Sequence, residues 1–174
     1  DASSSHEIKH TPRPGHADVT GSQKFGGFND YRGGGHFSGR LTATLVAAGV
    51  VAKKILGKAK VEAKLIEAGG SKDINAAVDR ALAAGDSVGG LIECKVSGLP
   101  IGLGEPFFDS AESLLGHIIF SIPATKGIEF GAGFRSASMK GSECNDEIIS
   151  AKGTTSTNNS GGINGGITNG NQLL

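Results

Sequence analysis

The sequence predicts an α+β fold in which antiparallel strands have helices packed against them. Residues 61–65 and 91–96 alternate apolar with charged side chains, the pattern of strands with one face in water. Residues 41–56, 73–84 and 110–122 place apolar side chains at helical spacing or on most sides. Because segments of both kinds have an apolar surface to bury, helices packed on a sheet satisfy both.

The first half of the chain is expected to hold a buried helix, a strand and a surface helix. Pro12 and Pro14 end a polar lead-in, because proline stops helix propagation. The segment 41–56 is apolar on most sides, so we expect its helix to lie inside the protein. The helix over 73–84 is expected to end at Gly85 and to pack on the sheet.

The second half is expected to continue the sheet and add one more helix. Cys94 lies on the apolar face of its strand, which predicts a core-filling role rather than a nucleophilic one. The helix over 110–122 follows a D-x-x-E start, and His117 is expected to pack beside its apolar face. Residues 127–131 are expected to form a further strand.

The 174 residues suffice for a single domain over 1–174 with a substantial core. Residues 1–11 form the polar lead-in. Residues 153–170 are rich in Ser, Thr, Asn and Gly and have too few apolar groups to order themselves. We therefore expect a tail over 153–174 that a ligand or another subunit holds in place.

Composition excludes several classes of partner. The 17 basic and 17 acidic residues leave no net field to attract nucleic acid or a membrane surface. The two cysteines, Cys94 and Cys144, have no nearby partner, and no apolar run is long enough to span a bilayer. Without a signal peptide in this sequence, these features predict reduced thiols and a cytoplasmic location.

Residues 12–42 concentrate cations, an imidazole and glycines, which predicts an anion site. Arg13, His16, Arg32 and Arg40 supply the charge. The glycines allow backbone N–H groups to approach a ligand closely. An apolar helix follows at once, and a helix N-terminus favours phosphate through its unpaired N–H groups and its dipole.

Blocks spread over nearly the whole chain resemble one enzyme family. They are RPGHAD (13–18), DYRGGG (30–35), SGR (38–40), GDSVGG (85–90), GLGEPFFD (102–109), KGIEFG (126–131) and GGINGGITNG (161–170). In this order they are similar to the chorismate synthase family. The resemblance implies a segment of that family's β-α-β sandwich and a homotetramer.

The resemblance also implies the chemistry. The expected reaction is the anti-elimination of phosphate from the small-molecule substrate 5-enolpyruvylshikimate 3-phosphate, which gives chorismate in the shikimate pathway. The expected cofactor is reduced FMN, which is not consumed overall. The source of the reduced flavin stays open, including an NADP-dependent reductase activity of the protein itself.

The resemblance assigns roles to residues whose chemistry suits them. His16 is implied as a catalytic histidine, and its imidazole can exchange a proton near neutrality. Arginine holds phosphate or carboxylate through paired hydrogen bonds, which suits a charged substrate. The implied substrate-binding residues are Arg13, Asp18 and Arg40, and the implied cofactor-binding residues are His36, Phe37, Ser38, Ala124 and Gly165.

The chain also departs from the family pattern. His36-Phe37-Ser38-Gly39-Arg40-Leu41-Thr42 stands where Arg-Ser-Ser-Ala-Arg-Glu-Thr is common. The family's Ser-His-Gly block, with its first catalytic histidine, and the family's last third have no counterpart in this sequence. We therefore expect part of a longer polypeptide, with little turnover by itself.

Two alternatives use the same residues differently. His6-Glu7-Ile8-Lys9-His10 fits the zinc-protease pattern H-E-x-x-H, with His16 as third ligand and Glu7 as base. The prolines that follow disfavour the helix which that pattern requires. The second alternative is a non-catalytic fragment that binds flavin or phosphate through the glycine and arginine loop.

Overall fold

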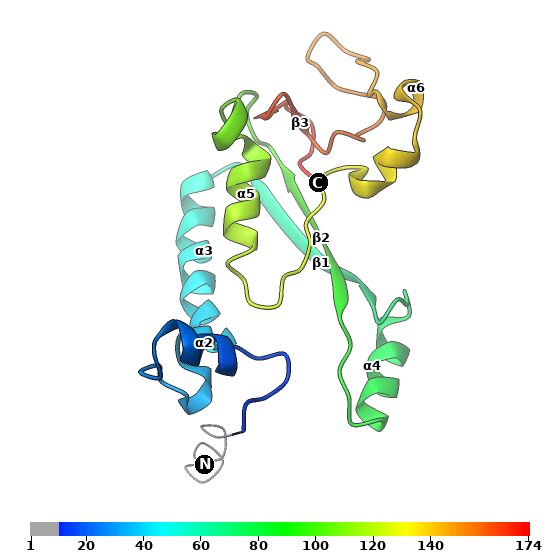
Figure 1. Cartoon of the computed structure of the whole chain (residues 1–174). Helices are drawn as coiled ribbons and strands as arrows, with labels where there is room; N and C mark the ends of the chain where they lie inside the picture. The colour runs from blue at the N-terminus through cyan, green and yellow to red at the C-terminus, as the bar shows by residue number, and fades with distance from the viewer. Residues whose placement is uncertain (1–10) are drawn as a thin grey trace. The chain divides into compact units, whose positions relative to one another are not determined.

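The computed structural model describes residues 11–174, drawn in colour in Figure 1. His6, Glu7 and His10 of the zinc alternative lie outside the described residues. The chain divides into two compact units: one extends to Ala52 and includes Phe120–Lys126, and the other comprises Lys53–Ile119 and Gly127–Leu174. Helices and small antiparallel sheets confirm the predicted α+β class.

The first unit holds short helical segments that frame a glycine loop. Helix α2, Asp18–Lys24, is followed by two 3-10 turns, Arg32–Phe37 and Gly39–Leu41. Helix α3, Thr42–Leu56, begins directly after the second turn and crosses into the other unit. The predicted helix over 41–56 is therefore confirmed, including the basic residues in its last turn.

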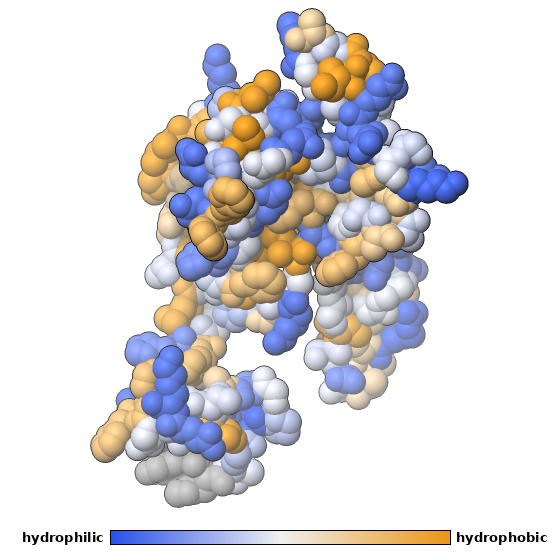
Figure 2. Space-filling model, turned by 45° about the horizontal axis from the view of Figure 1, so that its top comes forward, coloured by the Kyte–Doolittle hydropathy of each residue, from blue (hydrophilic) through white to orange (hydrophobic). Residues whose placement is uncertain are grey.

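The expected burial of this helix is wrong. No residue of α3 is buried, and Val46 and Ile55 are 70% and 81% exposed. A helix that is apolar on most sides forms here without a covering layer in the described part of the chain. The face drawn in Figure 2 likewise shows orange apolar residues at the surface among blue polar ones.

The second unit is built on an antiparallel pair of strands. Strand β1, Lys60–Ala68, pairs with β2, Gly90–Ser97, so that Ala63 lies opposite Cys94. Helix α4, Ile74–Ala83, connects the two strands and contacts β1. Asp73 caps its N-terminus through the Ala76 N–H. Gly85 follows its end with φ 67°, which confirms the predicted C-terminal glycine.

The predicted core role of Cys94 is wrong. Its side chain is exposed, and neighbouring Ile92 is 66% exposed. A two-stranded sheet can bury a residue only where another layer covers it. The core of this unit forms at one end of the sheet instead, where Ala111, Ile163 and Leu173 are packed by Val96, Leu99, Leu115 and Phe130.

Helix α5, Ala111–Ile119, is shorter than the expected 110–122. Its first turn is capped by Ser110, whose Oγ accepts a hydrogen bond from the Ser113 N–H at 3.1 Å, rather than by the predicted D-x-x-E start. His117 is exposed, so its predicted packing role is also wrong. Ala111 and Leu115 of α5 pack in the core of this unit.

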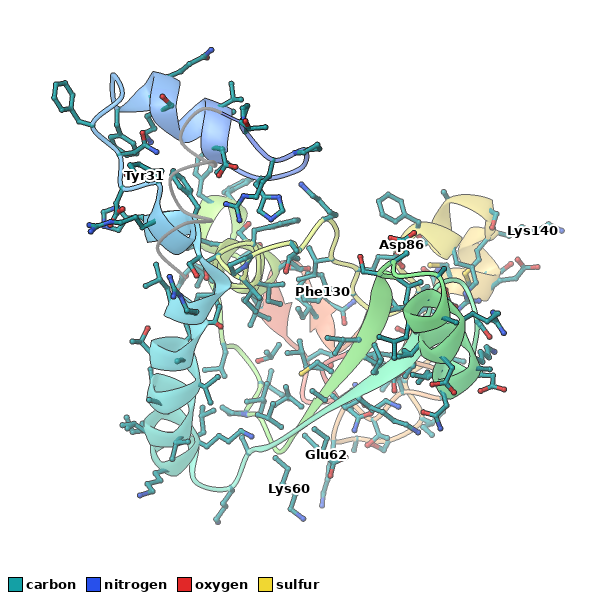
Figure 3. The ribbon with its side chains drawn as sticks, turned by 90° about the horizontal axis from the view of Figure 1, so that it is seen from below. Tyr31, Lys60, Glu62, Asp86, Phe130 and Lys140 are labelled. Carbon is teal, nitrogen blue, oxygen red and sulfur yellow. The ribbon has the colours of Figure 1, made fainter. Side chains whose placement is uncertain are left out.

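Residues 127–131 do not form the predicted strand. Residues 127–130 have no regular secondary structure, and Gly131 lies in a turn with φ 58°. The Gly131 N–H donates to the Leu174 carbonyl at 2.9 Å. Phe130 packs against the core, beside the hairpin that includes Ile163 (Figure 3).

The C-terminal segment is folded by contacts within its own chain. Its short elements are the 3-10 turn Gly133–Ser138, α6 (Gly141–Cys144) and the hairpin of β3 (Ile163–Asn164) and β4 (Ile167–Thr168). Both hydrogen bonds and apolar burial connect residues 153–174 to the rest. The Asn159 N–H donates to Asp146, the Thr168 hydroxyl donates to the Pro100 carbonyl, and Ile163 and Leu173 are part of the core. A ligand or second subunit as an additional support stays a prediction.

Candidate active site

Arg13 and Asp18 form a two-pronged ion pair at the start of α2. Nε and Nη2 of Arg13 donate to Oδ2 and Oδ1 of Asp18, each at 2.9 Å, and the Arg13 backbone N–H also donates to Oδ2. These hydrogen bonds lower the pKa of Asp18 to about 2. Asp18, expected to contact substrate, thus orients Arg13, whose guanidinium has five N–H donors and uses two of them here.

His16 occupies the turn that precedes α2, with an exposed side chain. Its Nδ1 lies 3.0 Å from the carbonyl oxygen of Pro14. Because a carbonyl oxygen only accepts hydrogen bonds, Nδ1 of the neutral ring bears the hydrogen and Nε2 bears the lone pair. The turn therefore presents Nε2 as the atom that can take up a proton.

The glycine loop is tightly folded on itself. Gly33, Gly34 and Gly35 have φ values of 59°, 85° and 50°, which residues other than glycine rarely adopt. A Cβ on Gly35 would lie 2.5 Å from the Asp30 carbonyl oxygen, and one on Gly33 would lie 2.5 Å from Nη2 of Arg40. These two glycines thus make room for the chain itself, which differs from the ligand approach that the sequence predicts.

Ser38 and Arg40 are bonded to each other at the start of the helical segment. The Arg40 backbone N–H and Nε donate to Ser38 Oγ at 3.3 and 3.1 Å, and Arg40 Nη2 donates to the Gly33 carbonyl at 3.0 Å. Both bonds to Ser38 use its oxygen lone pairs, so its hydroxyl hydrogen is free to donate elsewhere. The predicted position of Ser38 at a helix start is confirmed.

Phe37 connects the glycine loop to α2. Its ring lies so close to Gly21 that a Cβ there would be 2.8 Å from a ring carbon, and its centroid is 6.4 Å from that of Phe25. The loop that bears Ser38 and the helix that begins at Asp18 are thereby packed together in one unit. Both polar clusters, Arg13–His16–Asp18 and Ser38–Arg40, belong to this unit.

Ala124 and His36 are the other expected cofactor contacts of this unit. Ala124 lies in the Phe120–Lys126 segment and has φ 69°, a strained conformation for a residue with a side chain. Strain of this kind is often retained where the backbone serves a ligand. The side chain of His36 is exposed in the loop between Gly35 and Phe37.

Gly165 belongs to the second unit, at the tip of the β3–β4 hairpin. Gly165 and Gly166 form its two-residue turn, with φ values of 61° and 84°. A Cβ on Gly165 would meet no atom within 4 Å, so this side of the tip is open.

Sequence reasoning missed Asp146, which holds the loop that leads to this hairpin. Its Oδ1 accepts from Thr157 Oγ1 and the Asn159 N–H, and its Oδ2 accepts from the Ser160 N–H and Oγ, all between 2.6 and 2.8 Å. Partial burial raises the pKa of Asp146, but these hydrogen bonds outweigh it and lower the pKa to about 2. Its partners are 11 to 14 residues away, and no local pattern marks such a contact.

The described residues offer no structural support for a metal centre or a membrane span. Within 11–174, no group of three or more His, Cys, Asp and Glu side chains could hold a metal ion. None of the helices over the same residues combines the length and apolar character that crossing a bilayer requires.

The fold and this site define a class: an α+β protein whose first unit holds an arginine and a histidine ahead of α2 and a bonded serine and arginine ahead of α3. A family model described as chorismate synthase matches residues 1–174. The chain belongs to the chorismate synthase family.

Individual relatives agree with the family model. A chorismate synthase of Chitinophaga pinensis is 63% identical over 169 residues, which cover 97% of this chain and 51% of the relative. One of Korarchaeum cryptofilum is 43% identical and matches 100% of this chain and 57% of its own length. A crystal structure of chorismate synthase superposes with a TM-score of 0.81 at 26% identity, covering 89% of this chain and 60% of that one. The chain thus spans about half the length of the curated relatives.

Proposed function

We propose that the protein acts in the chorismate synthase reaction, the anti-elimination of phosphate from 5-enolpyruvylshikimate 3-phosphate to give chorismate. Family membership over the whole chain supports this proposal. The single structural observation that carries it is the turn ahead of α2. It holds both Arg13, which is fixed by Asp18, and His16, whose Nδ1 lies against the Pro14 carbonyl and leaves Nε2 for proton exchange. The zinc alternative has no support from the family or from the described residues.

The substrate loses a phosphate and a proton, so the site must neutralise an anion and manage a proton. Arg13, oriented by Asp18, and Arg40, oriented by Ser38 and Gly33, can bind phosphate or carboxylate oxygens. His16 can hold or transfer a proton at Nε2. These roles for His16, Arg13, Arg40 and Asp18 are part of the proposal.

The residues of the first unit fit a reduced FMN cofactor in their chemistry. The free hydroxyl hydrogen of Ser38 and the strained backbone at Ala124 suit a ligand with phosphate and ring carbonyl acceptors. When bound, reduced flavin supplies an electron transiently and regains it as the product diene forms. We propose that His36, Phe37, Ser38 and Ala124 contact it. Gly165, in the second unit, stays a cofactor contact that the family likeness implies.

The family likeness also motivates proposals on assembly and location. We propose a homotetramer in the cytoplasm, with the small-molecule substrate as the ligand and without a nucleic-acid or membrane partner. Size-exclusion chromatography with light scattering tests the assembly, and a stable monomer at micromolar concentration would contradict it.

An anaerobic titration tests the proposed function. Chemically reduced FMN is added to the chain, and the flavin spectrum is followed before and after addition of the substrate. We expect saturable flavin binding and a further spectral change on substrate addition. Saturable binding without that change, and without chorismate, would favour the non-catalytic fragment, and no binding at all would contradict the proposal.

A further inference from the structure

The hairpin of β3 and β4 has one open side and one tightly packed side. A Cβ on Gly165 would meet nothing within 4 Å, whereas one on Gly166 would lie 2.9 Å from the Cβ of Ser110. The Gly166 carbonyl accepts a hydrogen bond from the Ala111 N–H at 2.8 Å, at the first residue of α5. The turn is thus seated against the start of a helix while its tip faces outward.

Thr168 fixes the other end of this hairpin to the loop 100–103. Its hydroxyl donates to the Pro100 carbonyl at 2.7 Å and accepts from the Leu103 N–H at 2.9 Å. Its backbone N–H donates to the Leu103 carbonyl at 2.9 Å, and its carbonyl accepts from the Gly102 N–H at 2.8 Å. These four bonds join residues 65 or more positions apart in the sequence.

Among the described residues, Thr168 is the only polar or charged one that is buried, with 4% of its surface exposed. A buried hydroxyl that both donates and accepts has a defined orientation, and removal of either bond leaves a backbone group without its partner. The paired strands are only two residues long each, so ladder bonds alone give the hairpin little rigidity.

We propose that Thr168 is the positioning residue for the Gly165–Gly166 turn. Its hydroxyl fixes the position of the hairpin on the 100–103 loop. This position brings the Gly166 carbonyl to the Ala111 N–H and leaves Gly165 exposed at the tip. The consequence for flavin rests on the proposed function, because it uses Gly165 as a cofactor contact. The consequence for the hairpin itself does not.

Three variants test the proposal. Thr168→Val removes the hydroxyl at nearly constant shape, Thr168→Ser restores it, and Thr155→Val is the matched control. The Thr155 hydroxyl donates to the Thr157 carbonyl in a different loop of the same unit. The readouts are amide hydrogen exchange at Leu103 and Ala111 and the dissociation constant of reduced FMN.

Thr168→Val removes both hydrogen bonds of the hydroxyl. It is expected to accelerate exchange at both amides and to weaken flavin binding by about tenfold. Thr168→Ser and Thr155→Val should stay within about twofold of the unaltered chain. A Thr168→Val chain that keeps its circular dichroism, its Ala111 exchange and its flavin affinity would overturn the proposal.

A second measurement covers the case in which Thr168→Val does not fold. In the unaltered chain, the Leu103 and Ala111 amides should exchange with similar protection, since one opening of the hairpin breaks both bonds. Much faster exchange at Leu103 than at Ala111 would contradict the proposal. If the unaltered chain binds no flavin, the proposed function fails while both exchange measurements still decide the role of Thr168.

Discussion

At the scale of single residues, two similar ion pairs occupy very different environments. In the Arg13–Asp18 ion pair, the side chain of Asp18 is only 13% exposed. The Arg32–Asp30 ion pair has the same arrangement, but both of its side chains are exposed. Hydrogen bonds from the paired arginine lower the pKa of both aspartates. An exposed pair adds little to stability, because water screens it and both side chains lose freedom. The Arg13 pair is therefore the one that organises the site.

Asp18→Asn is expected to lower the free energy of unfolding by about 1 kcal/mol at pH 7, because a charged hydrogen-bonded pair at a partly exposed site is lost. The folded-state pKa of about 2 lies below the ordinary value of 3.8, so this contribution is present above pH 4 and disappears as the pH falls towards 2. Urea unfolding of both chains between pH 2 and 7 measures the difference.

The control for this prediction is Asp30→Asn, which removes the exposed pair. It should change stability much less than Asp18→Asn. A difference between Asp18→Asn and the unaltered chain that persisted unchanged at pH 2 would contradict the assignment of the pair.

At the scale of elements, backbone geometry explains why glycines follow one another in the loop 33–35. Two of them are required where the chain passes its own Asp30 carbonyl and the Arg40 side chain. The loop thereby places Ser38 at the start of the following helical turns. Its shape is a property of the polypeptide before any ligand is present.

Gly35→Ala is expected to destabilise this loop by at least about 1–2 kcal/mol, since the residue has a positive φ and its new methyl group would collide with the Asp30 carbonyl. Gly39→Ala is the matched control, because a Cβ there meets nothing within 4 Å. Thermal unfolding and amide exchange of residues 30–40 distinguish the two. Equal behaviour of both variants would show that the loop has another conformation.

Asp146→Asn is expected to lower the free energy of unfolding by about 2 kcal/mol. An amide keeps one acceptor oxygen, but its NH2 group would face the backbone N–H groups that now donate to the carboxylate. Exchange of the Asn159 and Ser160 amides should accelerate. Glu147→Gln, a charge change at the next residue, serves as the control. Exchange rates unchanged by Asp146→Asn would show that the loop is held by other contacts.

Local sequence patterns predicted the positions of helices and strands better than they predicted which residues are buried. The two strands, α4 and the helix after Ser38 follow from periodicity and caps that a few neighbouring residues determine. Burial depends on what covers an element, so α3, Cys94 and His117 were assigned to the interior wrongly. Residues 127–131 were taken for a strand because Ile128 and Phe130 alternate, although no strand within residues 11–174 pairs with them.

At the scale of the whole chain, the family is evident from sequence blocks, and the structure adds how site residues are held. The blocks named Arg13, His16, Ser38 and Arg40, which the fold gathers into one unit. The distant partners of Asp146 and Thr168 could not be inferred, because hydrogen bonds between remote segments leave no local signature. The contact of Asp18 with Arg13 is local but was not predicted either.

The most direct test joins this chain to the remaining sequence of its Chitinophaga pinensis relative and measures anaerobic formation of chorismate with reduced FMN. The chimera should turn over the substrate, and its His16→Ala variant should lose at least about 100-fold in turnover, the range of a lost proton-transfer group, while it keeps flavin affinity. The exposed His117→Ala serves as the control and should remain active. A chimera that makes chorismate equally well with and without His16 would contradict the account of this site.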